Sequence, residues 1–177
     1  GRVEEDDRVL AKRFGGGFMP ADLAHEIKPF ALAAVRELCE ETGLVVGRNA
    51  PFLEHGAAWG PFAASGHSPA PESLFPLARA VTPPGRVRRY DTWFFVTEAK
   101  AVSGKSTLPD GELLDLAWFT FAEAAGLDLP RITKLILDDV VALILNDPEI
   151  TGLSELLPFY YSAGSAYRRD LISCKVA

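Results

Sequence analysis

The chain contains the segment Arg36-Glu37-Leu38-Cys39-Glu40-Glu41-Thr42-Gly43-Leu44, which ends a run of apolar residues at helical spacing. The run begins after Pro29 and includes Leu32, Val35, Leu38 and Cys39, a pattern typical of one face of an α-helix. Proline is tolerated in the first turn of a helix, and glycine is a common residue just past its C-terminal end. The pattern therefore predicts a helix that starts at about Pro29 and stops at Gly43.

Three glutamates share one face of this predicted helix. At about 100° per residue, Glu40 and Glu41 fall within roughly 60° of Glu37. Leu32, Val35 and Cys39 lie on the opposite side. Like charges at these spacings cost an isolated helix about 0.2–0.5 kcal/mol per pair, and we expect no Lys or Arg of the helix to neutralise them. A hard divalent cation, Mg²⁺ or Mn²⁺, takes such oxygen ligands. The simpler alternative, common for Glu-rich helices, is a solvated acidic face.

The spacing of these residues resembles the second half of the Nudix box, G-x5-E-x7-R-E-U-x-E-E-x-G-U, where U is aliphatic. Every fixed position of that half is present from Arg36 to Leu44. Gly1 and Asp7 resemble the opening G-x5-E, with Asp in place of Glu, but residues 8–35, 28 in number, follow Asp7 instead of seven. We interpret residues 8–28 as an insertion, as in the Nudix branch that includes coenzyme A diphosphatases, and we do not assign Asp7 to the metal site.

Two further segments extend the resemblance beyond the box. Thr82-Pro83-Pro84 followed by Arg88-Arg89-Tyr90-Asp91-Thr92 is similar to the same branch, as is the stretch from Glu112 to Phe121 leading into Glu123-Ala124. The resemblance therefore runs from Gly1 to about Leu145. The tail from Pro148 to residue 177 adds nothing to it.

The resemblance implies an α/β (α+β) fold, a Nudix-type α/β/α sandwich with a mixed sheet. It also implies metal-dependent hydrolysis of the diphosphate linkage in a nucleoside diphosphate derivative, with coenzyme A or a related nucleotide among the substrates. Glu37, Glu40 and Glu41 would bind Mg²⁺ or Mn²⁺, and Glu112 would be a further ligand. Arg36 would hold a box carboxylate in position. The general base stays open between Glu37 and Glu112, and Glu112 has the alternative role of capping a turn.

Arg86, Arg88 and Arg89 form the densest basic cluster of the chain. The planar guanidinium group suits phosphate recognition, so we predict that these residues bind substrate. An alternative of equal weight is that their charges keep a sheet edge soluble. His25, His55 and His67 have no ligand-like spacing and receive no role.

Composition limits the remaining possibilities. A chain of 177 residues with 48% hydrophobic residues is long enough for one core, so we predict a single domain over residues 1–177. The net charge of −6 disfavours nucleic acid and anionic membranes as partners and leaves a small nucleotide-type molecule. Cys39 and Cys174 are far apart, which favours a reducing, cytoplasmic location. No apolar run reaches the roughly 18 residues of a membrane span.

The rest of the chain gives coarser predictions. Residues 50–76 read as a long surface connection that can contain a short helix. Residues 77–81 read as a strand, 91–99 as a central strand, 109–111 as a turn and 113–121 as another strand. A short helix should follow at 122–126, and a long amphipathic helix over 130–145 should pack on the sheet. The tail from residue 148 reads as irregular or partly helical.

Two alternatives to catalysis remain, and one segment is expected upstream. A Nudix-fold binding or regulatory module without catalysis is the first alternative, and a plain scaffold domain is the second. The family's first strands precede the box, so we expect the natural chain to begin further upstream. Without those strands, a partner chain, as in a homodimer, would have to complete the sheet.

Overall fold

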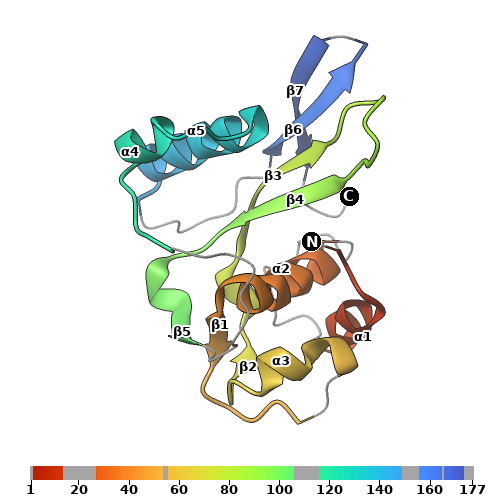
Figure 1. The fold of residues 1–177 in the computed structure, drawn as a ribbon, viewed down its shortest axis with the longest axis vertical. Helices are drawn as coiled ribbons and strands as arrows, with labels where there is room; N and C mark the ends of the chain where they lie inside the picture. Colours follow the sequence, from red (N-terminus) through yellow and green to blue (C-terminus); the bar gives the residue numbers. More distant parts are fainter. Residues whose placement is uncertain are drawn as a thin grey trace. The chain divides into compact units, whose positions relative to one another are not determined.

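The computed structural model describes residues 2–13, 27–53, 56–105, 116–148, 156–164 and 166–173. The chain divides into two compact units (Figure 1). Unit 1 comprises Gly1–Leu74, Thr97–Leu116 and Lys175–Ala177, and unit 2 comprises Phe75–Val96 and Ala117–Cys174. Helices combine with two sheets, one of them mixed. This mixed α/β class is the one predicted from the sequence, whereas the single-domain boundary stays a prediction.

Unit 1 contains the predicted acidic helix as α2 (Lys28–Thr42). Pro29 lies in its first turn, and Gly43 ends it in the left-handed conformation with φ 73°, which glycine adopts without the steric cost of a Cβ. The other helical elements among the described residues of unit 1 are α1 (Glu5–Arg13), η2 (Ala57–Trp59), α3 (Gly60–Ala63), η3 (Pro71–Ser73) and η4 (Ala99–Ala101).

The apolar side of α2 forms the centre of the unit 1 core. Leu32, Val35 and Cys39 are fully buried, and α2 packs on β1 (Leu44–Arg48). β1 pairs antiparallel with β2 (Ser68–Pro69) on one side and with β5 (Val102–Lys105) on the other. The buried face fixes the rotation of α2, so the glutamates lie on the side of the helix that faces away from this core.

The prediction of a surface connection over residues 50–76 was wrong in its central part. Trp59 and Phe62 are both 0% exposed, and their rings pack edge to face with centroids 5.3 Å apart. Phe52 contacts both rings. The glycine and proline residues of this segment suggested a loop, but its aromatic side chains bury large apolar areas and make it part of the core.

Unit 2 is a mixed four-stranded sheet with helices. The strands are β3 (Phe75–Val81), β4 (Asp91–Val96), β6 (Leu156–Ala163) and β7 (Ala166–Ser173), in the order β4-β3-β6-β7. β3 and β6 are parallel and the other pairs are antiparallel. The helices are α4 (Phe121–Ala125) and α5 (Arg131–Asn146). Ile136 of α5 packs on Leu77, Ala78 and Tyr160, which confirms the predicted long helix and its packing on the sheet.

Three predictions for the strands of this unit were wrong. The tail forms the hairpin of β6 and β7 rather than an irregular or helical segment. β4 is an edge strand among the four described strands, not a central one. Residues 116–120 form no strand. Thr120 instead caps the N-terminal end of α4 and forms a capping box with Glu123. The predicted turn at 109–111 and residues 113–115 lie outside the described residues.

Candidate active site

Arg36 directly precedes Glu37 on α2 and is only 5% exposed. Its Nε and Nη2 donate to the two carboxylate oxygens of Asp7 at 3.2 and 3.1 Å. Its Nη1 donates to Oε2 of Glu40 at 2.8 Å. The planar guanidinium group thus binds Asp7 with two parallel hydrogen bonds and holds a glutamate of the box with a third.

Asp7 is fully buried and its carboxylate accepts two further hydrogen bonds. Nε1 of Trp59 donates to Oδ1 at 2.9 Å, and the backbone N–H of Glu4 donates to Oδ2 at 2.8 Å. The Asp7 carboxylate is therefore a structural partner of Arg36 that ties α1 to α2. Asp7 is the residue that the sequence places at the end of the G-x5-E half of the box, but its contact with Arg36 was not predicted, and no signal in the sequence pointed to Trp59.

The guanidinium group of Arg36 keeps its positive charge although it is buried. Burial disfavours the guanidinium charge, but hydrogen bonds and charges from Asp7 and Glu40 outweigh it and raise the pKa of Arg36 above its ordinary value. Arg36 therefore stays a cation that keeps the end of the acidic face in a fixed conformation.

The three glutamates of α2 have different surroundings. Glu40 forms the ion pair with Arg36 four residues before it. Oε1 of Glu37 accepts the backbone N–H of Arg2 and lies 3.5 Å from Nη2 of Arg36. The expectation that no basic residue of the helix neutralises this face was therefore wrong, because Arg36 sits one turn before Glu40. Glu41 has no hydrogen bond or ion pair with any residue that the structure describes.

The carboxylates of this face are the predicted ligands of a divalent cation. In the described part of the chain, no group of three or more His, Cys, Asp or Glu side chains is close enough to hold a metal ion. The chemistry of the donors still fits Mg²⁺ or Mn²⁺, since carboxylate oxygens are their preferred ligands. Of the three carboxylates, that of Glu41 is the one without a hydrogen bond or ion pair in the described part of the chain. Glu112, the further predicted ligand, lies outside the described residues.

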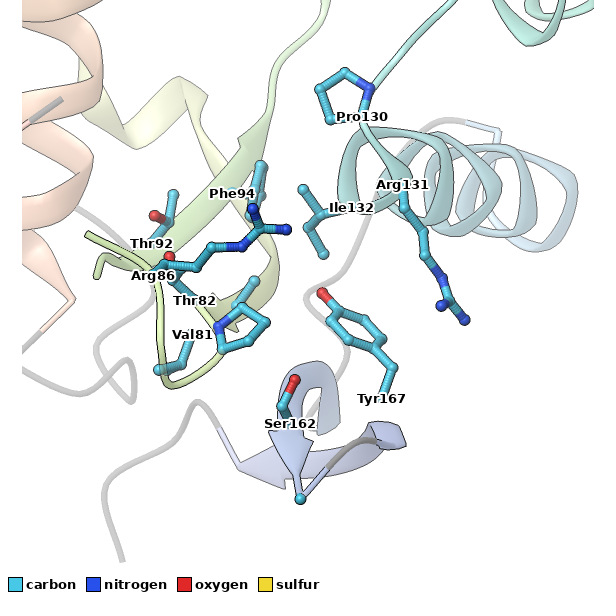
Figure 2. Close-up of a pocket in the computed structure, with 13 residues that line it drawn as sticks. Val81, Thr82, Arg86, Thr92, Phe94, Pro130, Arg131, Ile132, Ser162 and Tyr167 are labelled. Carbon is cyan, nitrogen blue, oxygen red and sulfur yellow. The ribbon is translucent and has the colours of Figure 1, made fainter. Parts of the chain in front are cut away.

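The predicted arginine cluster belongs to unit 2, in the connection between β3 and β4. All three side chains are exposed. Nε of Arg89 donates to the backbone oxygen of Thr82 at 3.2 Å, so Arg89 partly stabilises its own loop. Arg86 lines a pocket (Figure 2), whereas Arg88 does not. The structure thus divides a cluster that the sequence presented as one group.

Comparison with known proteins identifies the family. Residues 3–139 match the family model of the NUDIX domain. The matched stretch includes α2 with its glutamates and ends within α5. The chain belongs to this family, and its members are pyrophosphohydrolases that act on nucleoside diphosphate derivatives. Searches of curated proteins and of solved structures found no significant match. Among the described residues, no helix is long and apolar enough to cross a membrane.

Proposed function

We propose that the chain hydrolyses the diphosphate linkage of a nucleoside diphosphate derivative with the help of Mg²⁺ or Mn²⁺, and that coenzyme A or a related nucleotide is its substrate. The family match and the Arg36 to Leu44 motif on one helix support this proposal most strongly. A cytoplasmic location belongs to the same proposal.

The residues of α2 have separate roles in this proposal. Glu37 and Glu41 bind the cation, with Glu40 beside them and Glu112 as a further ligand. The cation, when bound, neutralises phosphate oxygens and orients the attacking water. Arg36 is a positioning residue, because it contacts Asp7 and Glu40 and acts on the site through them. The prediction that Arg86, Arg88 and Arg89 bind substrate, made from the sequence, is part of this proposal.

A substrate panel tests the reaction. Coenzyme A, a nucleotide sugar, a dinucleotide and NADH are incubated separately with the full chain and Mg²⁺ or Mn²⁺, and the products are separated by chromatography. We expect one compound to be split into two monophosphate products. Binding without cleavage of any compound would instead favour the regulatory module.

A pair of variants links the reaction to α2. Glu41→Gln should lower kcat on the order of 100-fold, because it removes an anionic ligand at the centre of the reaction. Glu5→Gln, in the exposed first turn of α1, should leave kcat unchanged. Equal activity of the Glu41→Gln variant and the wild type would contradict the proposed role of Glu41.

A further inference from the structure

Unit 2 contains a pocket of about 590 Å³. It is lined by β3, β4 and the connection between them, by the N-terminal end of α5, and by the end of the β6–β7 hairpin (Figure 2). Pockets that bind small molecules commonly measure about 300–1,000 Å³. The pocket is therefore of a size that a small organic molecule fills.

The charge of the pocket is positive although the chain is acidic. Its lining includes Arg86 and Arg131 and no Asp or Glu, in a protein with a net charge of −6. Acidic residues elsewhere in unit 2 pair with other arginines: Asp91 with Arg79, and Asp139 with Arg169. Arg86 has no ion pair within the described part of the chain, so a bound anion would be its first counter-charge.

Further polar groups of the pocket wall can act as donors to an anion. Within the described ranges, the hydroxyls of Ser162 and Tyr167 have no hydrogen-bond partner. Pro130 and Arg131 begin α5, and the first backbone N–H groups of a helix have no intrahelical acceptor and carry a partial positive charge. The guanidinium group of Arg131 stacks over the ring of Tyr167, 5.2 Å from its centroid, so Arg86 is the cation left for direct contact.

The remaining wall is apolar. Val81 and Phe94 come from β3 and β4, and Ile132 comes from the first turn of α5. Figure 2 shows Arg86, Phe94 and Ile132 among the side chains that line the pocket. A ligand in this pocket would therefore meet both a cation and an aromatic surface.

We propose that this pocket binds a small organic phosphate ester. The phosphate pairs with Arg86 near the N-terminal end of α5, and the apolar body of the ester lies against Phe94 and Ile132. Arginine's fork matches the geometry of phosphate oxygens, and helix N-termini are common phosphate sites. The pocket consists only of residues of unit 2 and needs neither the glutamates of α2 nor a metal ion.

Calorimetric titration of the full chain with EDTA present tests this proposal. The probes are phenyl phosphate, inorganic phosphate and benzyl alcohol. We expect phenyl phosphate to bind saturably and more tightly than the other two, because only this probe has both the charge and the aromatic body. No saturable binding of phenyl phosphate, or equal binding of benzyl alcohol, would overturn the proposal.

Three variants locate the binding. Arg86→Gln should weaken phenyl phosphate binding on the order of 10-fold, since it removes a charge-assisted hydrogen bond. Lys134→Gln removes the same charge from an exposed position of α5 that does not line the pocket, and it should bind like the wild type. Glu41→Gln should also bind like the wild type, which separates this site from hydrolysis. Wild-type affinity in Arg86→Gln, or an equal loss in either of the other two variants, would contradict the assignment.

Discussion

The side chain of Asp7 shows how a single residue connects the two halves of the box. It is fully buried, yet Arg36, Trp59 and the backbone of Glu4 supply four hydrogen bonds to its two oxygens. A buried carboxylate without such partners would be costly, and so would an unpaired Arg36. The pair therefore stabilises the packing of α1 on α2 only while both charges are present.

Replacement of Asp7 by Asn should lower the free energy of unfolding by about 3 kcal/mol or more, because it leaves the Arg36 cation buried without its main counter-charge. Urea denaturation followed by circular dichroism measures this change. The matched Glu5→Gln variant, exposed on the same helix, should stay within about 0.5 kcal/mol of the wild type. A loss below about 1 kcal/mol in Asp7→Asn would show that the ion pair is not needed for stability.

The sequence predicted the shared face of the glutamates and, from the resemblance, that Arg36 holds one of their carboxylates. It did not predict the partner of Arg36 on α1. Helical geometry alone relates Glu37, Glu40 and Glu41, because they lie within five residues. The contact between Asp7 and Arg36 spans residues 8–35, and no local pattern determines which residue meets Arg36 after such an insertion. The choice of Glu41 as the unengaged carboxylate likewise required the structure.

The C-terminal end of α2 is fixed by one glycine. The φ of 73° at Gly43 costs other residues roughly 1–2 kcal/mol. Gly43→Ala should therefore lower the free energy of unfolding by about 1 kcal/mol. Gly60 has φ −53° and open space around it, so Gly60→Ala should be neutral or stabilising by up to about 1 kcal/mol. Thermal melts of both variants measure the contrast, and an equal destabilisation would contradict it.

Tyr160 links α5 to the hairpin of β6 and β7. Its hydroxyl donates to Asp139 at 2.7 Å and accepts from Nε of Arg169 at 3.1 Å. Burial, followed by the hydrogen bond to Asp139, raises the pKa of Tyr160 from 10.0 to about 12. The folded state therefore keeps this proton at a pH where the unfolded chain has lost it.

The sign of the pH dependence follows from this shift. The stability that the protonated Tyr160 provides is complete below pH 10 and is lost as the pH rises from 10 to about 12. Tyr160→Phe should therefore lose less stability than the wild type over this interval. Denaturant titrations at several pH values compare the two slopes, and identical slopes would mean that Tyr160 does not titrate as the structure implies.

The elements that the sequence predicted well are those defined by local spacing, namely α2, β3 and α5. The hairpin of β6 and β7 was missed because it pairs with β3, eighty residues earlier, with Arg79 opposite Phe159. Pro158 interrupts the alternation that would have indicated β6. Pairing over such a distance is a tertiary effect, and local propensity does not predict it.

At the scale of the whole molecule, the sequence predicted the family and the α/β class, and the match over residues 3–139 supports both. It did not predict the pocket in unit 2, because residues from β3, β4, α5 and the hairpin form it together. The net charge of −6 affects the two proposed sites in opposite ways. The acidic face of α2 attracts cations, whereas an anion must rely on the local arginines.

The central claim is that the carboxylates of α2 bind the divalent cation used in the hydrolysis. Its most direct test is a Mn²⁺ titration followed by electron paramagnetic resonance of the unbound ion. The full chain should bind Mn²⁺ saturably, and a Glu37→Gln, Glu41→Gln double variant should bind it at least on the order of 10-fold more weakly, while Glu5→Gln should match the wild type. Unchanged Mn²⁺ affinity in the folded double variant would contradict the claim.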